Sequence, residues 1–342
     1  MKLSYLFLLL SIGFLGQTAP ALAASDAGLR YIKTRGTVRC GTDLQSKFYA
    51  YKDEDGLWRG IDVDLCKAIS WAVFNRPDRF QMVDIKKDAI NHALQKNKID
   101  VMFGVDSFSA LQEITQKNMT IDITYYERQM FAAHKIDGAT SMEAYKGAKV
   151  CTVRGSEDFQ NVNTYSRLYK LDFTPLVFHS SYRAKEAFLL NRCQLLTGNT
   201  SFLQDVVENK SSQSKDVVLL PESIAIKPVY ALVSKDNNTL RISLKWIFNA
   251  LKSAESNEIN SQNVKVFIGS KDIAVQNLLG DNPHLWNKFG LSPNWVRNAI
   301  ADIGNYGEIY ERNFGKDSPL GLKRRENNLI KNHGLIIPKP FL

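Results

Sequence analysis

Short motifs that indicate catalysis are missing from this chain of 342 residues. Its five histidines form no H-E-x-x-H spacing, and neither a P-loop nor a G-x-S-x-G pattern is present. The four cysteines include no C-x-x-C pair and have no histidine near them, which argues against a zinc site. We therefore expect no metal and no cofactor, and we do not expect an enzyme.

Long hydrophobic runs are also missing, except at the N-terminus. There, Met1-Lys2 precedes an apolar stretch from Leu3 to Leu15, and the small-residue site Ala21-Leu22-Ala23 follows. This order is typical of a cleaved secretory signal, and the stretch is shorter than the ~20 apolar residues of a membrane-spanning helix. We expect residues 1–23 to be removed on export and the remaining chain to be soluble.

The positive charge of the chain is not gathered into a patch. Lysines and arginines number 44 against 35 aspartates and glutamates, a formal charge of +9 at pH 7, and the densest basic run is only Lys323-Arg324-Arg325. A nucleic-acid binder clusters such charge on one face or along one helix. We interpret the excess as a solvated basic surface and expect no nucleic-acid partner.

The order of the apolar segments indicates an α/β fold, because short apolar stretches alternate with segments of helical periodicity. Two similar units begin with cysteine-bearing strands, at Gly36–Cys40 and Gly147–Cys151. In a chain too long for one hydrophobic core, they predict two lobes with a cleft between them, a common place for a small-molecule site. In the first unit, Asp62 stands where the N-cap of a helix belongs.

The four cysteines permit three pairings, and export favours disulfides over free thiols. We expect Cys40–Cys66 and Cys151–Cys193, because each pair then stays within one lobe. These pairs would close loops of 26 and 42 residue steps (66 − 40 and 193 − 151). The chain-entropy model assigns ~3–4 kcal/mol of stabilisation to each bridge.

Six segments between about residue 29 and the C-terminus are notable for their order and spacing. They are Thr37–Gly41, Gly60–Cys66, Lys149–Cys151, Asn191–Cys193, Gly304–Asn313 and Ser318-Pro319-Leu320. In order and spacing they resemble the periplasmic solute-binding proteins of polar amino-acid ABC transporters (solute-binding protein family 3), nearest to the general L-amino-acid binders. The resemblance implies the type II periplasmic binding protein fold, with a ligand cleft between two lobes and two hinge crossovers.

The resemblance also implies where the lobes divide. Lobe 1 is expected at residues 24–128 and 232–342, lobe 2 at residues 129–231, and the crossovers near Tyr126–Lys135 and Val229–Lys235. It further implies a periplasmic location, a monomer, an inner-membrane ABC permease as partner, and a small polar solute as ligand, namely an amino acid or a derivative of one.

On the lobe 1 side, the resemblance places Phe48 over the side chain of the ligand and the hydroxyl groups of Ser107 and Ser109 beside its α-carboxylate. Gln112, however, stands where the family has an arginine. A guanidinium binds a carboxylate through two charge-assisted hydrogen bonds, whereas an amide brings no charge. Arg128 or Arg154 could supply the missing cation.

On the lobe 2 side, the family has Gly-Ser/Thr-Thr at a helix N-terminus, where backbone N–H groups bind anions. This chain has Gly155-Ser156-Glu157-Asp158, and the carboxylates would repel an incoming carboxylate. Asn199 stands where an acidic residue should meet the ammonium group of the ligand. Ser156, Glu157 and Asn199 are therefore the expected ligand-binding residues of lobe 2.

Three interpretations follow from this rewritten pocket. The first is the substrate-binding component of an amino-acid or polar-solute ABC transport system. The second is a degenerate paralogue with altered or lost ligand binding, acting as a sensor or a scaffold. A dehydratase-like periplasmic enzyme, with Glu157 as general acid, is the least favoured. The departures at Gln112, Glu157 and Asn199 would also be explained if other residues of these loops match the family positions.

Overall fold

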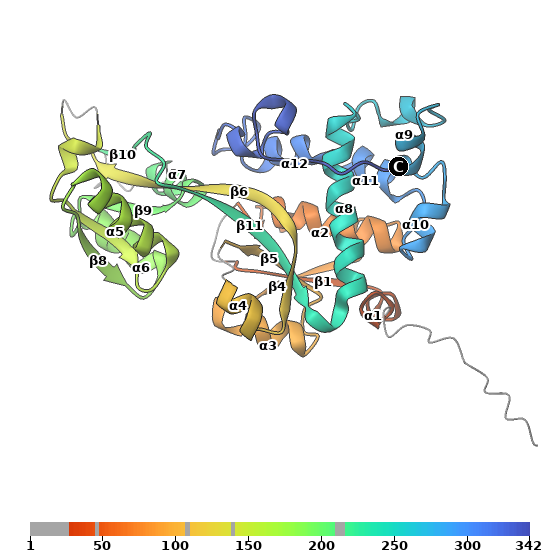
Figure 1. Ribbon diagram of the computed structural model, residues 1–342, viewed down its shortest axis with the longest axis horizontal. Helices are drawn as coiled ribbons and strands as arrows, with labels where there is room; N and C mark the ends of the chain where they lie inside the picture. The colour runs from red at the N-terminus through yellow and green to blue at the C-terminus, as the bar shows by residue number, and fades with distance from the viewer. Residues whose placement is uncertain (1–26, 45–47, 107–109, 138–140, 209–215) are drawn as a thin grey trace, which may run out of the picture.

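The computed structural model describes residues 27–44, 48–106, 110–137, 141–208 and 216–342, so the predicted signal at residues 1–23 lies outside them. The described chain forms two α/β lobes joined by a long two-stranded ribbon (Figure 1). No helix in these ranges is both long enough and apolar enough to cross a membrane. The two-lobed α/β fold predicted from the sequence is confirmed.

The ribbon consists of β6 (Asn118–His134) and β11 (Ala225–Ser234), which overlap the crossovers expected near Tyr126–Lys135 and Val229–Lys235. They pair antiparallel, with Asn118 opposite Ser234 at the lobe 1 end and Gln129 opposite Ala225 at the lobe 2 end. β11 also pairs with β5, and β6 with β9. One sheet therefore runs through both lobes in the order β4-β1-β5-β11-β6-β9-β7-β8, with β10 on β6.

Lobe 1 is built on a parallel sheet in which β1 (Val38–Thr42) lies between β4 (Phe80–Asp84) and β5 (Val101–Val105). On one face of this sheet lie α2 (Ile61–Phe74) and α8 (Asn238–Ser256), and α11 (Trp295–Ile303) and α12 (Tyr306–Asn313) pack against these two helices. The other face carries α3 (Ile90–Gln95). The apolar side chains of the helices and strands meet in one large core.

Lobe 2 repeats the arrangement with β7 (Lys149–Val153) between β8 (Thr174–Phe178) and β9 (Leu195–Asn199). Successive residues of these strands alternate between two hydrophobic clusters, one on each face, as the period of a strand requires. One face carries α6 (Ser181–Leu189) and α7 (Thr200–Glu208), and the other carries α5 (Glu157–Tyr169).

The remaining elements are shorter or lie at the periphery. They are α1 (Ala27–Arg35), β2 (Tyr51–Lys52), β3 (Trp58–Arg59), η2 (Lys87–Ala89), α4 (Ala110–Thr115), η3 (Met142–Tyr145), β10 (Val217–Leu219), η4 (Lys235–Asn237), η5 (Val264–Phe267), α9 (Ile273–Leu279), α10 (His284–Lys288), η6 (Arg325–Asn327) and η7 (Ile330–Asn332).

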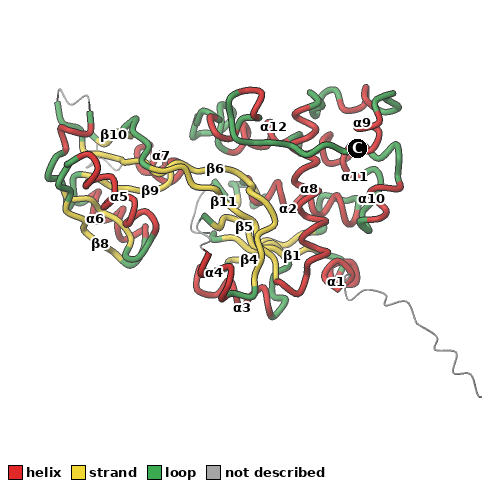
Figure 2. Tube along the Cα trace, viewed as in Figure 1, coloured by secondary structure: helices red, strands yellow, loops and turns green. Residues whose placement is uncertain are grey.

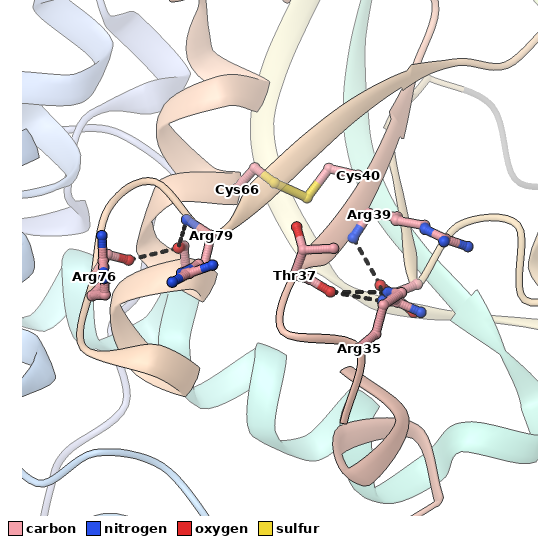
Figure 3. Close-up of a disulfide and its surroundings, with 9 residues drawn as sticks. Arg35, Thr37, Arg39, Cys40, Cys66, Arg76 and Arg79 are labelled. Carbon is pink, nitrogen blue, oxygen red and sulfur yellow. Dashed lines mark hydrogen bonds and ion pairs between the residues drawn. A yellow bond between two sulfur atoms is a disulfide. The ribbon is translucent and has the colours of Figure 1, made fainter. Parts of the chain in front are cut away.

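Both predicted disulfides are present. Cys40 on β1 is bonded to Cys66 on α2, so this bridge ties the central strand of lobe 1 to the helix above it (Figure 3). Cys151 on β7 is bonded to Cys193, which precedes β9 and so ties the central strand of lobe 2 to the connection that leads into its neighbour. The predicted pairing is therefore confirmed.

The start of α2 differs from the prediction. Its N-cap is Gly60, with φ 119°, and a Cβ there would lie 2.2 Å from the carbonyl oxygen of Tyr49. Asp62 lies in the first turn, is fully buried, and accepts a hydrogen bond from the Thr42 hydroxyl at 2.7 Å. The prediction of Asp62 as N-cap was wrong because the chain packs too closely against Tyr49 for any side chain at the cap.

The C-terminal segment, residues 304–342, returns across lobe 1, and after α12 most of it is loop (Figure 2). Its motif at Gly304–Asn313 forms α12, which begins with a capping box between Asn305 and Glu308. Further along, the Asn327 side chain accepts from the Tyr126 backbone N–H at 2.7 Å and donates to the Tyr126 carbonyl at 2.9 Å. The segment therefore holds β6 where this strand leaves lobe 1.

Candidate functional site

A buried ammonium group joins the two lobes near the lobe 2 end of the ribbon. Lys227 lies on β11 and its side chain is only 2% exposed. Its Nζ is 2.8 Å from Asp158 Oδ1, in the first turn of α5 in lobe 2, and 3.3 Å from Asp106 Oδ2, directly after β5 in lobe 1. One cation on β11 is thus shared by carboxylates from the two lobes.

The opposite charges of Lys227 and its two aspartates keep one another ionised. Burial alone would lower the pKa of Lys227, but the Asp158 and Asp106 carboxylates outweigh that effect and raise it. Burial would likewise raise the pKa of Asp106, yet the ammonium groups of Lys227 and Lys87 bring it below its usual value. Both partners therefore stay ionised, and their charge is fixed at the junction of the lobes.

A second polar cluster crosses the junction beside the first. The Tyr49 hydroxyl of lobe 1 donates to Glu127 Oε1 on β6 at 2.6 Å, and the Ser201 hydroxyl of α7 donates to the same oxygen at 2.7 Å. The two hydroxyl oxygens are themselves 2.6 Å apart. Burial raises the pKa of Glu127, although these hydrogen bonds and Lys227 oppose the shift.

Asn199, a predicted ligand-binding residue, connects the two clusters. It ends β9. Burial and the Glu127 carboxyl raise the pKa of the Tyr49 hydroxyl well above its usual value, and the Asn199 amide opposes this rise; the same amide helps Lys227 and Lys87 to lower the pKa of Asp106 against burial. Its Oδ1 is buried and accepts no hydrogen bond within the described part of the chain. An unsatisfied buried acceptor is costly, so this oxygen is suited to an N–H donor of a ligand.

Asp62 Oδ1 and the Tyr125 hydroxyl, on the lobe 1 side, are also buried without a hydrogen-bond partner among the described residues. Burial raises the pKa of Asp62 to about 7, against a lowering by the Thr42 hydroxyl. The carboxyl group of Asp62, together with those of Glu127 and Asp106, also raises the pKa of Tyr125 after burial itself. These groups make the lobe 1 wall of the junction acidic.

Ser156 and Glu157, two predicted ligand-binding residues of lobe 2, make different contacts. Ser156 is the N-cap of α5; its hydroxyl accepts from the Phe159 N–H at 3.1 Å and donates to the Val153 carbonyl at 2.8 Å. Glu157 is exposed beside Asp158, and loss of solvent raises its pKa more than Lys227 lowers it. The hydroxyl of Ser156 is thus used by the helix, whereas the Glu157 carboxyl faces the charged cluster.

On the lobe 1 side, Gln112 is half-buried on the short helix α4, and Phe48 packs half-buried against the core with its ring edge-on to Tyr51 at 6.3 Å. Ser107 and Ser109 lie outside the described residues.

Neither arginine named as a replacement cation reaches the cluster around Lys227. Arg128 pairs through two nitrogens with Glu326 of the C-terminal segment, with Nε 2.8 Å from Oε2. Arg154 is exposed.

The sequence interpretation missed Lys227, Asp106 and Asp158 as members of one site. Asp106 and Asp158 stand in the two loops that the interpretation singled out, next to the residues chosen there. Lys227 carried a signal of its own, because a lysine inside a mostly apolar extended segment, directly before Pro228, has to be buried with a partner. Tyr49, Glu127 and Ser201 offered no such signal.

The arrangement can bind a charged polar solute. Around the buried ammonium of Lys227 stand the carboxyl groups of Asp106, Asp158, Glu157 and Glu127. Carboxylates form strong charge-assisted hydrogen bonds with ammonium groups.

Comparison with known proteins supplies the family. The family model of the bacterial extracellular solute-binding proteins, family 3, matches residues 38–265, which is two thirds of the chain and includes both crossover strands. The chain belongs to this family. The resemblance stated from the sequence is confirmed, and the chain is a solute-binding protein.

Relatives match over nearly the whole length. YhdW of Escherichia coli K12 is 30% identical over 325 residues, which cover 93% of either chain. The general L-amino acid-binding periplasmic protein AapJ of Rhizobium johnstonii is 29% identical over 94% of either chain. Their length shows that the C-terminal segment, which extends beyond the family model, is shared with these relatives.

Among solved structures, a periplasmic binding protein of an ABC transporter from Brucella ovis, with glutathione bound, superposes with a TM-score of 0.84 at 29% identity. The match covers 92% of this chain and 99% of that one. An ancestral arginine-binding protein bound to arginine covers 66% of this chain with a TM-score of 0.51 at 23% identity, and shows the shared fold.

Proposed function

We propose that this protein is the periplasmic substrate-binding component of an ABC transport system for an amino acid or a related polar solute. The solute is held between lobe 1 (residues 24–128 and 232–342) and lobe 2 (residues 129–231), next to the Lys227 cluster. Residues 1–23 direct export and are removed. The protein works as a monomer with an inner-membrane permease and is not an enzyme.

The observation that carries the proposal is the ion cluster that spans both lobes. Lys227 is bonded to Asp106 on one side and Asp158 on the other. Since these carboxylates come from different lobes, a solute that binds both of them holds the lobes together. That is the coupling a binding protein needs between ligand and closure.

The charges at the junction favour a solute with an ammonium group as its main anchor. Carboxyl groups of Asp106, Asp158 and Glu157 surround Lys227. The Asn199 Oδ1 atom lacks a donor within the described residues and would accept one more N–H. Gln112 brings no cation for the α-carboxylate, so that end of the solute is held by neutral donors, for which the resemblance proposes Ser107 and Ser109, with Phe48 over the side chain of the solute.

A second candidate is a paralogue that has lost amino-acid binding. It is favoured by one observation: the only buried cation at the junction among the described residues, Lys227, is already paired with two aspartates of the protein itself. A closed internal ion cluster needs no ligand. A sensor or scaffold role would then remain for the fold.

A thermal-shift screen of the mature chain separates the two candidates. The panel contains the twenty amino acids and glutathione, which occupies the Brucella ovis protein. A bound solute stabilises the folded state by RT ln(1 + [L]/Kd), about 2.7 kcal/mol at one hundred times Kd. We expect at least one member of the panel to raise Tm. If none does, the transport proposal fails and the paralogue is supported.

Matched variants locate the binding. Asn199→Ala should weaken binding of the identified solute by about ten-fold, because it removes one hydrogen bond to a charged group. Asn298→Ala removes an asparagine on the surface of α11, where its side chain donates to Asn75, and serves as control. Equal affinity in both variants, measured by calorimetric titration, would exclude the Asn199 oxygen from the site.

A further inference from the structure

A cavity lies in lobe 1, away from the cluster around Lys227. It has a volume of about 120 Å³ and is bounded by the start of β6, by α8 and by the last residues of the chain. We call it the basic cavity, because its polar lining comes chiefly from Lys245, Lys252 and Lys339, with Asp122 as its carboxylate.

The one carboxylate of the basic cavity is already neutralised. Asp122 Oδ2 is 3.0 Å from Lys252 Nζ, and the same ammonium donates to the Ile123 carbonyl at 2.7 Å. Lys252 is only 5% exposed, so this pair belongs to the framework of the lobe. Lys245 and Lys339 form no ion pair with Asp122, although the Asp122 charge reaches Lys245 and opposes the lowering of its pKa.

Lys245 and Lys339 are held close to each other. Both side chains line the same cavity, and neither ammonium can accept a hydrogen bond from the other. The proximity of Lys339, then burial, lowers the pKa of Lys245. Neither amino group has an acceptor in the part of the chain that the structure describes. Two donors that converge without an acceptor between them form a place for an anion.

The backbone keeps Lys339 in this position. The Asn249 side chain accepts from the Lys339 N–H at 2.7 Å and donates to the Lys339 carbonyl at 2.9 Å. The Ser253 hydroxyl donates to the same carbonyl at 3.2 Å. Pro338 and Pro340 flank the lysine and restrict the chain on both sides. The Lys339 backbone is therefore fixed beside the cavity, and its side chain extends from a defined position.

We propose that the basic cavity is an anion site in which Lys245 and Lys339 together bind a phosphate-like oxyanion, either free in solution or as the headgroup of an anionic lipid. Arg241, one turn before Lys245 on α8, adds to the positive potential felt there. The site is separate from the proposed solute site, so it does not depend on the transport function.

The experiment titrates the mature protein with inorganic phosphate by calorimetry, with chloride at equal ionic strength as reference. Trp246 lines the cavity, so its fluorescence gives a second readout. We expect one phosphate per chain. Lys245→Met and Lys339→Met should each weaken binding by about ten- to hundred-fold, because each removes one charge-assisted contact. Lys323→Met makes the same charge change on an exposed part of the C-terminal segment and should bind like the wild type.

A second arm distinguishes the sources of the anion. Vesicles of phosphatidylglycerol are compared with vesicles of phosphatidylcholine by co-sedimentation. If the two pocket variants lose vesicle binding while free phosphate binds to no variant, the site takes a lipid headgroup. If phosphate and vesicles bind equally to Lys323→Met, Lys245→Met and Lys339→Met, or if binding follows ionic strength alone, the anion site is refuted.

Folding of the variants is checked without any anion. Each substitution removes one member of a like-charged pair and keeps the aliphatic stem of the side chain. We therefore expect Tm of Lys245→Met to equal or exceed that of Lys323→Met in chloride, whereas phosphate should raise Tm of the wild type only. A lower Tm of Lys245→Met in chloride would contradict the repulsion on which the site is based.

Discussion

The two lobes share one plan but are covered differently. In each, a central strand lies between two parallel neighbours, and a strand of the ribbon adds an antiparallel edge. In lobe 1, one face supports a core that runs from Leu29 to Phe341 and draws in the whole C-terminal region. Lobe 2 has two small clusters, one on each face of its sheet.

This difference shows how each lobe obtains its stability. A small domain buries a smaller fraction of its surface and relies more on covalent links than a large one. Lobe 2 therefore depends on the Cys151–Cys193 bridge, which lies inside one of its clusters. In lobe 1, Cys40–Cys66 is one contribution among many, since the C-terminal segment and four helices cover the same core.

Removing the disulfides one at a time is the strongest way to break the comparison. Cys151→Ala with Cys193→Ala should cost about 4 kcal/mol by the chain-entropy model, and Cys40→Ala with Cys66→Ala about 3.5 kcal/mol. Because lobe 2 has little core to compensate, only the first pair should split the calorimetric transition in two, with lobe 2 melting first. Equal single transitions for both pairs would contradict the unequal reliance on the bridges.

The pH dependence of stability sharpens the comparison on the lobe 1 side. Burial raises the pKa of Asp62 to about 7 in the folded state, from 3.8. The folded chain therefore keeps a proton that the unfolded chain has lost, and stability falls as pH rises from about 4 to about 7. Between pH 5 and pH 8 this group should cost about 2.5 kcal/mol of the free energy of unfolding.

Asp62→Asn should abolish this loss of stability, so the free energy of unfolding of the variant should rise relative to that of the wild type between pH 5 and pH 8. Denaturant unfolding at both pH values measures the difference. Asp88→Asn, an exposed carboxyl in the same lobe, is the control. If Asp62→Asn and the wild type lose the same stability over this range, the Asp62 carboxyl is not the group responsible.

Much of the fold could be predicted from the sequence. Strand and helix periods are local, and the cysteine pairs followed once each cysteine was assigned to a lobe. Gly60 shows the limit: the sequence places a capping residue near Asp62, but the close approach to the Tyr49 backbone that selects glycine is a tertiary contact. Such contacts override local preference.

The candidate site was predicted only in part, because its centre is assembled from distant segments. Lys227 pairs with Asp106 and Asp158 across 121 and 69 residues of chain. A family resemblance points to loops, and it led to Asn199, which does connect the two clusters. The resemblance could not show that Lys227 supplies a cation at the junction. Lys227 lies on β11, and the residues of the loops do not indicate that a lysine of this strand pairs with them.

The smallest expected effect concerns Ser156, for which the resemblance predicts a contact with the ligand. Its hydroxyl caps α5, as that of Ser180 caps α6 in the same lobe. Ser156→Ala and Ser180→Ala should each cost about 1 kcal/mol of unfolding free energy, since each removes one N-cap. Solute affinity should be unchanged in both, as measured by calorimetric titration. A ten-fold loss of affinity confined to Ser156→Ala would return this hydroxyl to the pocket, and it would mean that lobe 2 gives up a helix cap when it closes on the solute.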